Sequence, residues 1–274
     1  MRLTSKTLFA VAGPALIVTA CASDASGGEK VPIRSDFGLS FSPMYTAFDG
    51  VHDFRVPVVP VAAPSADLVV DSWEVVDSNG VLQKDVADIF ADDPSGGATL
   101  RTRKAGDYIV IAHAGDKIGC SELHIALGTP EQWSIGDALY HDPRMLSAKP
   151  TGLPDPVDLP DNTSCDGCHG AGSMYLDVVH TPQQTGGFSD AWFSSLFTMG
   201  TRLRSSGPPP MVPVCLPYEW SITEGIPLVV LRQFHVGDAS QEELAGLLLY
   251  LRSLPLMTQG SFDFGGAWRA PTDK

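Results

Sequence analysis

Five consecutive residues, Cys165-Asp166-Gly167-Cys168-His169, have the types and the spacing that could do chemistry. The pattern C-x-x-C-H is the attachment signal for c-type haem. Two thiols at this spacing can form thioether bonds to the two vinyl groups of one haem, and the histidine that follows can coordinate the iron from the proximal side. The motif therefore predicts redox chemistry at a covalently bound haem, with potential and access set by the protein around it.

A C-x-x-C pair also occurs in zinc sites and in thioredoxin-like redox motifs. A zinc site would need two further ligands in a similar cluster, and the sequence has no second C-x-x-C. A thioredoxin-like pair would lie between a strand and a helix of a βαβ unit, and no such pattern precedes Cys165. We therefore prefer haem to zinc, and zinc to a chance occurrence.

The first residues of the chain have the features of an export signal. Two basic residues precede an apolar run over 8–20, which is too short to span a bilayer as a helix. The run ends in Val-Thr-Ala-Cys21 and resembles the lipobox of bacterial lipoproteins. This resemblance implies that Cys21 carries a lipid and that 21–36 is a flexible tether. Ordinary cleavage after Ala20, with Cys21 as a free thiol, is the alternative.

Composition and charge narrow the classes of partner. The chain has 274 residues, of which 43% are hydrophobic and 18% charged, enough for two globular domains. The net charge is −14 and no cluster of lysine and arginine stands out, so we expect no nucleic acid partner. Acidity favours a basic electron-transfer partner, and it also keeps a protein soluble.

Two of the five cysteines have no role in lipid or haem attachment. In an oxidising compartment, Cys120 and Cys215 could form a disulfide that ties the two halves of the molecule together. Two separate buried thiols are the alternative, because the sequence does not show how close the two residues come.

Residues 37–130 carry the pattern of an all-β domain. Short runs rich in valine, isoleucine and aromatic residues alternate with turn signals, and no helical period of comparable strength is present. We expect an edge strand at 54–61, where prolines interrupt the run, a strand at 68–76 with a turn at 77–80, and a buried strand at 107–113. This pattern predicts a β-sandwich.

The same region resembles the group-2 bacterial immunoglobulin-like domains. The resemblance is carried by Trp73-Glu-Val-Val-Asp77 and by the stretch 98–106, which leads into the strand at 108–112. It implies a spacer or docking module that contains no catalytic residues.

A proline-rich connector is expected to follow the sandwich over 131–160, with Trp133 and Tyr140 packed against a domain. Four of its prolines break helices and stiffen the chain: Pro150, Pro154, Pro156 and Pro160.

Two helices are expected after the haem motif. The first covers 191–199, with Ser189 or Asp190 as its N-cap. The last is capped by Ser240, and Glu243 completes a capping box. It carries an apolar stripe at helical spacing and ends at Pro255; the stripe is Leu244, Leu247, Leu248, Leu251 and Leu254.

The region 161–256 resembles class I-type cytochrome c domains. The matching residues are Cys165-x-x-Cys168-His169-Gly170, the stretch 187–190 before a helix, and the final helical stretch 242–254. The resemblance implies a small all-α domain whose last helix packs on the helix with the haem motif. Two departures concern the distal side: Pro160 leaves little room for a helix ahead of the motif, and the stretch 199–235 is long.

The sixth ligand of the iron stays open at this stage. Members of the family supply methionine or histidine from the segment before the last helix, which makes His235 and Met211 the candidates, in that order. An open site follows them, and His180 comes last. We expect His180 to be a support residue near His169, and the Pro182 carbonyl to accept a hydrogen bond from the proximal imidazole.

Together these features predict an exported, lipid-anchored monohaem cytochrome facing the periplasm or the cell surface. Its expected function is one-electron transfer between redox partner proteins, and no catalytic triad, phosphate loop or carboxylate pair indicates an enzyme. A haem-based sensor or gas-binding protein, and a surface adhesion protein with a structural haem, are the alternatives. The predicted order is: signal peptide 1–20, tether 21–36, immunoglobulin-like sandwich 37–130, connector 131–160, cytochrome c domain 161–256 and tail 257–274.

Overall fold

The structure is a computed structural model. It describes six ranges of the chain: 29–61, 68–91, 96–142, 164–170, 180–199 and 239–257. The predicted signal peptide, the predicted lipidation site Cys21, the distal ligand candidates Met211 and His235, and the disulfide candidate Cys215 lie outside the described residues.

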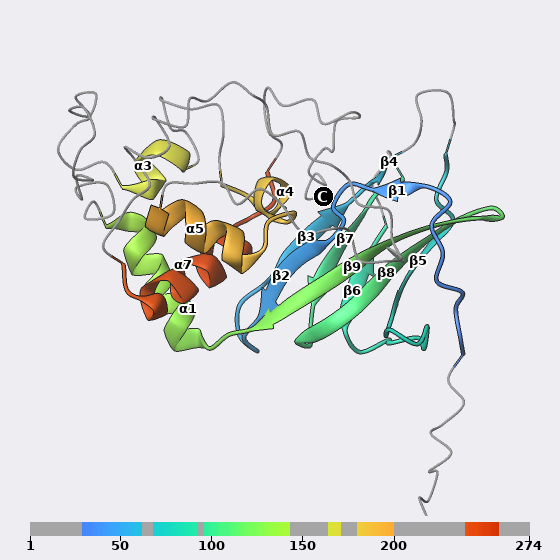
Figure 1. Cartoon of the computed structure of the whole chain (residues 1–274), viewed down its shortest axis with the longest axis horizontal. Coiled ribbons are helices and arrows are strands. Elements are labelled where there is room, and N and C mark those ends of the chain that lie inside the picture. Colours follow the sequence, from blue (N-terminus) through green and yellow to red (C-terminus); the bar gives the residue numbers. More distant parts are fainter. Residues whose placement is uncertain are drawn as a thin grey trace, which may run out of the picture.

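Two β-sheets face each other in the larger part of the molecule (Figure 1). The four-stranded sheet has the order β2 (Met44–Phe48), β9 (Lys117–Leu127), β8 (Gly106–Ala114) and β5 (Ser72–Val76). The three-stranded sheet has the order β3 (Arg55–Val58), β7 (Ala98–Thr102) and β6 (Ala87–Phe90). A short pair, β1 (Gly38–Leu39) and β4 (Pro60–Val61), completes the described strands.

The order of the strands identifies the type of sandwich. Strands β5, β8 and β9 form one sheet, strands β3, β7 and β6 form the other, and β2 adds to β9 in parallel. This is the arrangement of strands C, F and G against B, E and D in immunoglobulin domains. The predicted immunoglobulin-like sandwich is therefore confirmed, and β3 is an edge strand of its sheet, as its prolines predict.

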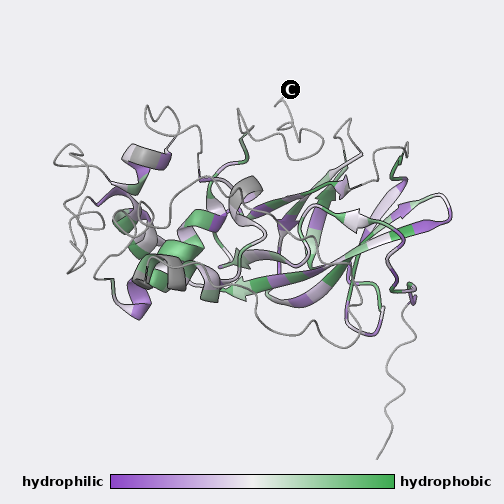
Figure 2. Ribbon diagram, turned by 45° about the horizontal axis from the view of Figure 1, so that its top comes forward, coloured by the Kyte–Doolittle hydropathy of each residue, from purple (hydrophilic) through white to green (hydrophobic). Residues whose placement is uncertain are grey.

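Apolar side chains of both sheets fill the space between them. Trp73 and Val75 on β5 point into this core, as the period of two predicts, whereas Val76 on the other face is buried in a second apolar cluster. Figure 2 shows apolar residues running along the strands. Cys120 on β9 is fully buried in a second apolar cluster of the sandwich.

The sandwich begins earlier than the sequence predicts. Lys30 bridges Val81, and the Val31 N–H donates to the carbonyl of Gly80 at 2.8 Å. Gly80 lies in the predicted turn with a φ of 78°, a conformation that favours glycine. Residues 29–36, assigned to the flexible tether, therefore belong to the sandwich, because Val31 is buried against it.

Helices gather at one end of the sandwich (Figure 1). They are α1 (Pro130–His141), α3 (Cys165–His169), α4 (Pro182–Thr185), α5 (Asp190–Met199) and α7 (Gln241–Ser253). Helix α7 has the predicted capping box: Ser240 Oγ accepts from the Glu243 N–H at 3.2 Å, and the Glu243 carboxylate accepts from the Ser240 N–H at 2.7 Å. Ser189 caps α5 by accepting from the Trp192 N–H. Both predicted helices are present. No helix within the described ranges is long and apolar enough to cross a membrane.

Helix α1 corrects the prediction of a connector from residue 131 onward. Thr129 and Gln132 form a reciprocal capping box, and Pro130 occupies the first turn, where its missing N–H costs nothing. Trp133 and Tyr140 do pack against other elements, as expected, but from a helix of 12 residues.

Helices α1 and α7 pack across two glycines. A Cβ atom on Gly246 would lie 2.6 Å from the Gln132 carbonyl oxygen and 3.0 Å from the Gly136 nitrogen. A Cβ atom on Gly136 would overlap the Gly246 carbonyl. The two backbones therefore touch, and only glycine at both positions allows this close crossing.

Candidate haem site

The haem motif lies on a short helix with a defined start. Ser164 caps α3, since its Oγ accepts a hydrogen bond from the Gly167 N–H at 3.1 Å. The Gly170 N–H donates to the Asp166 carbonyl at 2.6 Å and closes the turn. A Cβ atom on Gly170 would lie 2.8 Å from Asp166 Cγ, so a larger residue would disturb this turn. Helix geometry thus places Cys165, Cys168 and His169 on little more than one turn.

Cys165 is buried in an apolar cluster built by four helices. Cys165 as a whole residue is 7% exposed. Around it lie Leu139 and Tyr140 of α1, Phe193 and Phe197 of α5, and Leu244, Leu247, Leu248, Tyr250 and Leu251 of α7. The α7 residues in this cluster include four leucines of the predicted apolar stripe: Leu244, Leu247, Leu248 and Leu251. Such walls fit a porphyrin, which is flat, largely apolar and held by a cysteine at its edge. Of the predicted attachment residues, Cys165 has the apolar surroundings that a haem would need.

His180 is the neighbour that the structure brings to His169. The two imidazole rings are stacked, with centroids 4.0 Å apart and an interplanar angle of 21°. The His180 N–H also donates to the His169 carbonyl at 3.1 Å. His180 therefore lies beside the predicted iron ligand, where the sequence places a support residue. The carbonyl of Pro182, predicted to accept from the proximal imidazole, accepts from the Gly186 N–H at 2.9 Å.

Two tyrosines form part of the same cluster and remain neutral. Burial raises the pKa of Tyr140, and the nearby Cys165 and Asp166 raise it further. Burial also raises the pKa of Tyr250 to about 12, together with the charge of Asp137 and a hydrogen bond to that carboxylate. Both phenols thus keep their protons across the ordinary pH range and add no charge beside the motif.

Sequence reasoning did not assign either tyrosine to the site. Tyr140 was expected only to pack the connector, and Tyr250 had no role. The spacing of Trp133 and Tyr140, seven residues apart, would place both on one face of a helix. With α1 recognised from its capping box, that face could have been found.

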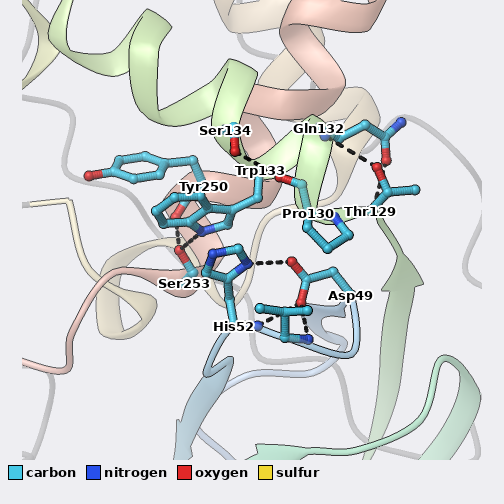
Figure 3. A network of polar contacts seen from close by, with 10 residues as sticks. Asp49, His52, Thr129, Pro130, Gln132, Trp133, Ser134, Tyr250 and Ser253 are labelled. Carbon is cyan, nitrogen blue, oxygen red and sulfur yellow. Dashed lines mark hydrogen bonds and ion pairs between the residues drawn. The ribbon is translucent and has the colours of Figure 1, made fainter.

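A polar network joins the helices to the sandwich (Figure 3). His52 stacks on Trp133 with ring centroids 3.8 Å apart, and its Nδ1 lies 2.6 Å from the Asp49 carboxylate. The Trp133 indole N–H donates to Ser253 Oγ at 2.6 Å. Burial raises the pKa of Asp49, but hydrogen bonds from the His52 ring and from backbone N–H groups outweigh it, so that the pKa lies below its ordinary value.

Arg252 makes a second connection at this junction. Its side chain is 4% exposed. The guanidinium donates to the carbonyls of Thr46 on β2 and Phe188, at 3.1 and 3.5 Å, and forms an ion pair with Asp190 at 2.5 Å. A buried cation with these partners fixes α7 on the sandwich.

Among the described residues, no group of three or more histidine, cysteine, aspartate and glutamate side chains gathers as a metal site would require.

Neither the known protein families nor the curated proteins give a match to this chain. Solved structures are similar over about a third of it. Titin module M5 shares 13% identity with a TM-score of 0.25, over 36% of this chain and 98% of that chain. Titin M4 shares 12%, with a TM-score of 0.22, over 36% and 94%. Domains 4 and 5 of the S-layer protein SbsC share 12%, with a TM-score of 0.24, over 36% and 55%. The strand order, not these scores, is the basis for the fold described above.

Proposed function

We propose that the chain is a monohaem c-type cytochrome that transfers single electrons. Cys165 and Cys168 would bind the haem, and His169 would ligate the iron. One observation carries the proposal: the C-x-x-C-H motif lies on a capped helix whose first cysteine is buried in an apolar cluster. If the motif had arisen by chance, there would be no reason for apolar side chains to surround its first cysteine.

Haem supplies a reversible one-electron couple when it is bound. The residues of the chain would control that couple in three ways. Helix α3 presents the thiols and the imidazole in a fixed order. The aromatic and leucine side chains of α1, α5 and α7 would exclude water from the haem. The neutral tyrosines Tyr140 and Tyr250 add no negative charge to the cluster.

The arrangement of helices supports the resemblance to class I-type cytochrome c domains. The resemblance calls for a helix ahead of the motif and a final helix. In chain order, α1 precedes the motif helix α3 and α7 is the last described helix. Both line the cluster that contains Cys165. Helix α7 packs mainly on α1, whereas the expectation from the family was packing on the motif helix.

The sandwich would hold the haem domain in a defined orientation. Because Arg252 bonds to the Thr46 carbonyl and Trp133 stacks on His52, we propose a docking platform for redox partners rather than a loose spacer. A lipid on Cys21 would keep this platform at a membrane surface, in the periplasm or on the cell exterior.

The test is haem staining of a denaturing gel, with oxidised and reduced absorption spectra, after co-expression with the maturation machinery for c-type haem. We expect a covalent haem band and sharp reduced peaks. Cys168→Ala should lose most of the covalent haem. Cys120→Ala is the matched control, since this buried cysteine lies in the sandwich. Undiminished staining of Cys168→Ala, or none in the unaltered protein, would contradict the proposal.

The same spectra address the distal ligand. His235→Ala should move a low-spin spectrum toward high spin if His235 binds the iron. An unchanged spectrum, with a sulfur-to-iron band that disappears in Met211→Ala, would assign Met211. Binding of carbon monoxide to the unaltered reduced protein would instead favour the sensor or gas-binding alternative.

A further inference from the structure

A cavity of about 190 Å³ lies where the helices meet the sandwich, next to the buried Arg252. Its walls come from β2, from the end of β9, from the first turn of α1, and from α5 and α7 (Figure 1). At its mouth, Leu127 is 77% exposed and Ala245 is exposed, so the cavity opens to solvent. Its deeper apolar residues are buried: Ala47, Leu244, Leu248 and Leu249.

Two buried polar atoms beside this cavity have no hydrogen-bond partner among the described residues. One is Nε of Arg252, a residue that lines the cavity. The other is Oγ1 of Thr46, whose carbonyl accepts a hydrogen bond from the same guanidinium. Folded proteins seldom leave a buried donor without an acceptor, because its lost hydration is not replaced. A bound group that offers an acceptor to the guanidinium would remove that cost.

Asp190 determines which charge the cavity accepts. Its carboxylate forms an ion pair with Arg252, its side chain is 55% exposed, and it lines the cavity. Of the described residues in the lining, these two carry the charges, and the charges cancel. A bound carboxylate would be repelled by Asp190, and a bound cation would be repelled by Arg252. A neutral group that contains both a hydrogen-bond acceptor and a donor matches the two residues together.

We propose that this cavity binds a small neutral amide that carries a short branched aliphatic group. The amide carbonyl accepts from the Arg252 guanidinium, the amide N–H donates to Asp190, and the aliphatic group packs on Ala47 and Leu248. A cavity of about 150 Å³ holds one benzene, so this one has room for about six or seven non-hydrogen atoms. Because the Nε–H is itself buried, binding requires a small turn of the guanidinium toward the cavity. The site goes beyond electron transfer and does not depend on haem.

The test is a titration of the full-length protein with three molecules of one shape. Isobutyramide is neutral, isobutyrate is an anion and isobutyramidine is a cation. The readouts are the nuclear magnetic resonance signals of the Ala47 and Leu248 methyl groups and of the Arg252 Nε–H. Reduced protein is used, so that a six-coordinate haem would be diamagnetic. We expect isobutyramide to shift all three signals and to bind at least about tenfold more tightly than either charged molecule.

Three variants localise the binding and test its selectivity. Ala245→Leu fills the mouth and should weaken the binding of isobutyramide by about tenfold or more. Ala138→Leu is the matched control, because Ala138 is an exposed helical alanine that does not line the cavity, and binding should stay within about twofold. Asp190→Asn leaves the charge of Arg252 without its counterion, so this variant should bind isobutyrate more tightly than isobutyramide.

Each opposite result overturns the proposal. If isobutyramide shifts none of the three signals, the cavity does not bind amides. Equal binding by Ala245→Leu and Ala138→Leu would place the binding elsewhere on the molecule. Isobutyrate bound by the unaltered protein as tightly as isobutyramide, or an Asp190→Asn protein that still prefers the amide, would contradict the selection by charge. Methyl signals far from the cavity report whether each variant is folded, and they do so whether or not haem is attached.

Discussion

The close crossing of α1 and α7 gives a prediction with a calculable sign. Gly136→Ala adds one methyl group at a helix interior position, where alanine is intrinsically favoured over glycine by about 1 kcal/mol. At this site the added Cβ would overlap the Gly246 carbonyl and lie 2.8 Å from the Tyr250 Cβ. Overpacking of this kind costs about 1–3 kcal/mol, and the upper end applies because a backbone carbonyl cannot rotate away. We expect a net loss of about 2 kcal/mol in the free energy of unfolding.

The assay is thermal unfolding of the full-length protein, followed by circular dichroism. A loss of that size lowers Tm by about 4–8 °C in a domain of 150–250 residues. Ser134→Ala is the matched control, because Ser134 lies exposed on the same helix and its Oγ donates only to the Pro130 carbonyl. A Tm for Gly136→Ala equal to or above that of Ser134→Ala would refute the close approach of the two helices.

Three further predictions concern the junction and the helix that packs there. Arg252→Met should lower the free energy of unfolding by about 2–4 kcal/mol, since it leaves two carbonyls without their donor. Asp190→Asn should lower it by less than about 1 kcal/mol, because the Asp190 side chain is largely exposed. Asp49→Asn should cost about 1–3 kcal/mol at neutral pH through its bonds to His52. The pKa of Asp49 is lowered by folding, so its contribution is full above the ordinary value of 3.8 and is lost as the pH falls through the lower folded value. Thr129→Ala should cost about 1 kcal/mol through loss of the α1 cap.

Urea unfolding measures all of these differences. Equal losses for Arg252→Met and Asp190→Asn would mean that the ion pair with Asp190, not the buried carbonyl bonds, holds α7. A deficit of Asp49→Asn that grows at acidic pH would reverse the sign derived above. A Thr129→Ala protein as stable as the unaltered one would mean that packing alone fixes the start of α1.

Local signals in the sequence were sufficient for several elements. Ser240 with Glu243 marks the start of α7, and the leucine spacing gives its buried face. The alternation around Trp73 places Trp73 and Val75 together on one buried face of a strand. These features depend on residues within a few positions of one another, and short-range rules describe them well.

Other features depend on contacts between distant parts of the chain. Helix α1 contains Ser134 and Gly136, which are poor helix formers, and packing against α7 overrides that preference. The stack of His180 on His169 and the ring contacts of Tyr250 with Tyr140 and Trp133 likewise arise from tertiary packing. No spacing rule in the sequence predicts which rings meet. The cytochrome fold and the distal ligand stay predictions.

The position of Arg252 also has a consequence for the order of assembly. Its hydrogen bond to the Thr46 carbonyl joins residues 206 positions apart in the chain. Helix α7 is synthesised after every other element that it touches. The junction between the sandwich and α1 therefore cannot form completely until α7 is present. Contacts of such long range slow folding and leave apolar surface open in the meantime. The apolar stripe of α7 and the face of α1 that it covers would therefore stay open to solvent until α7 docks, and Cys165 would become buried only then.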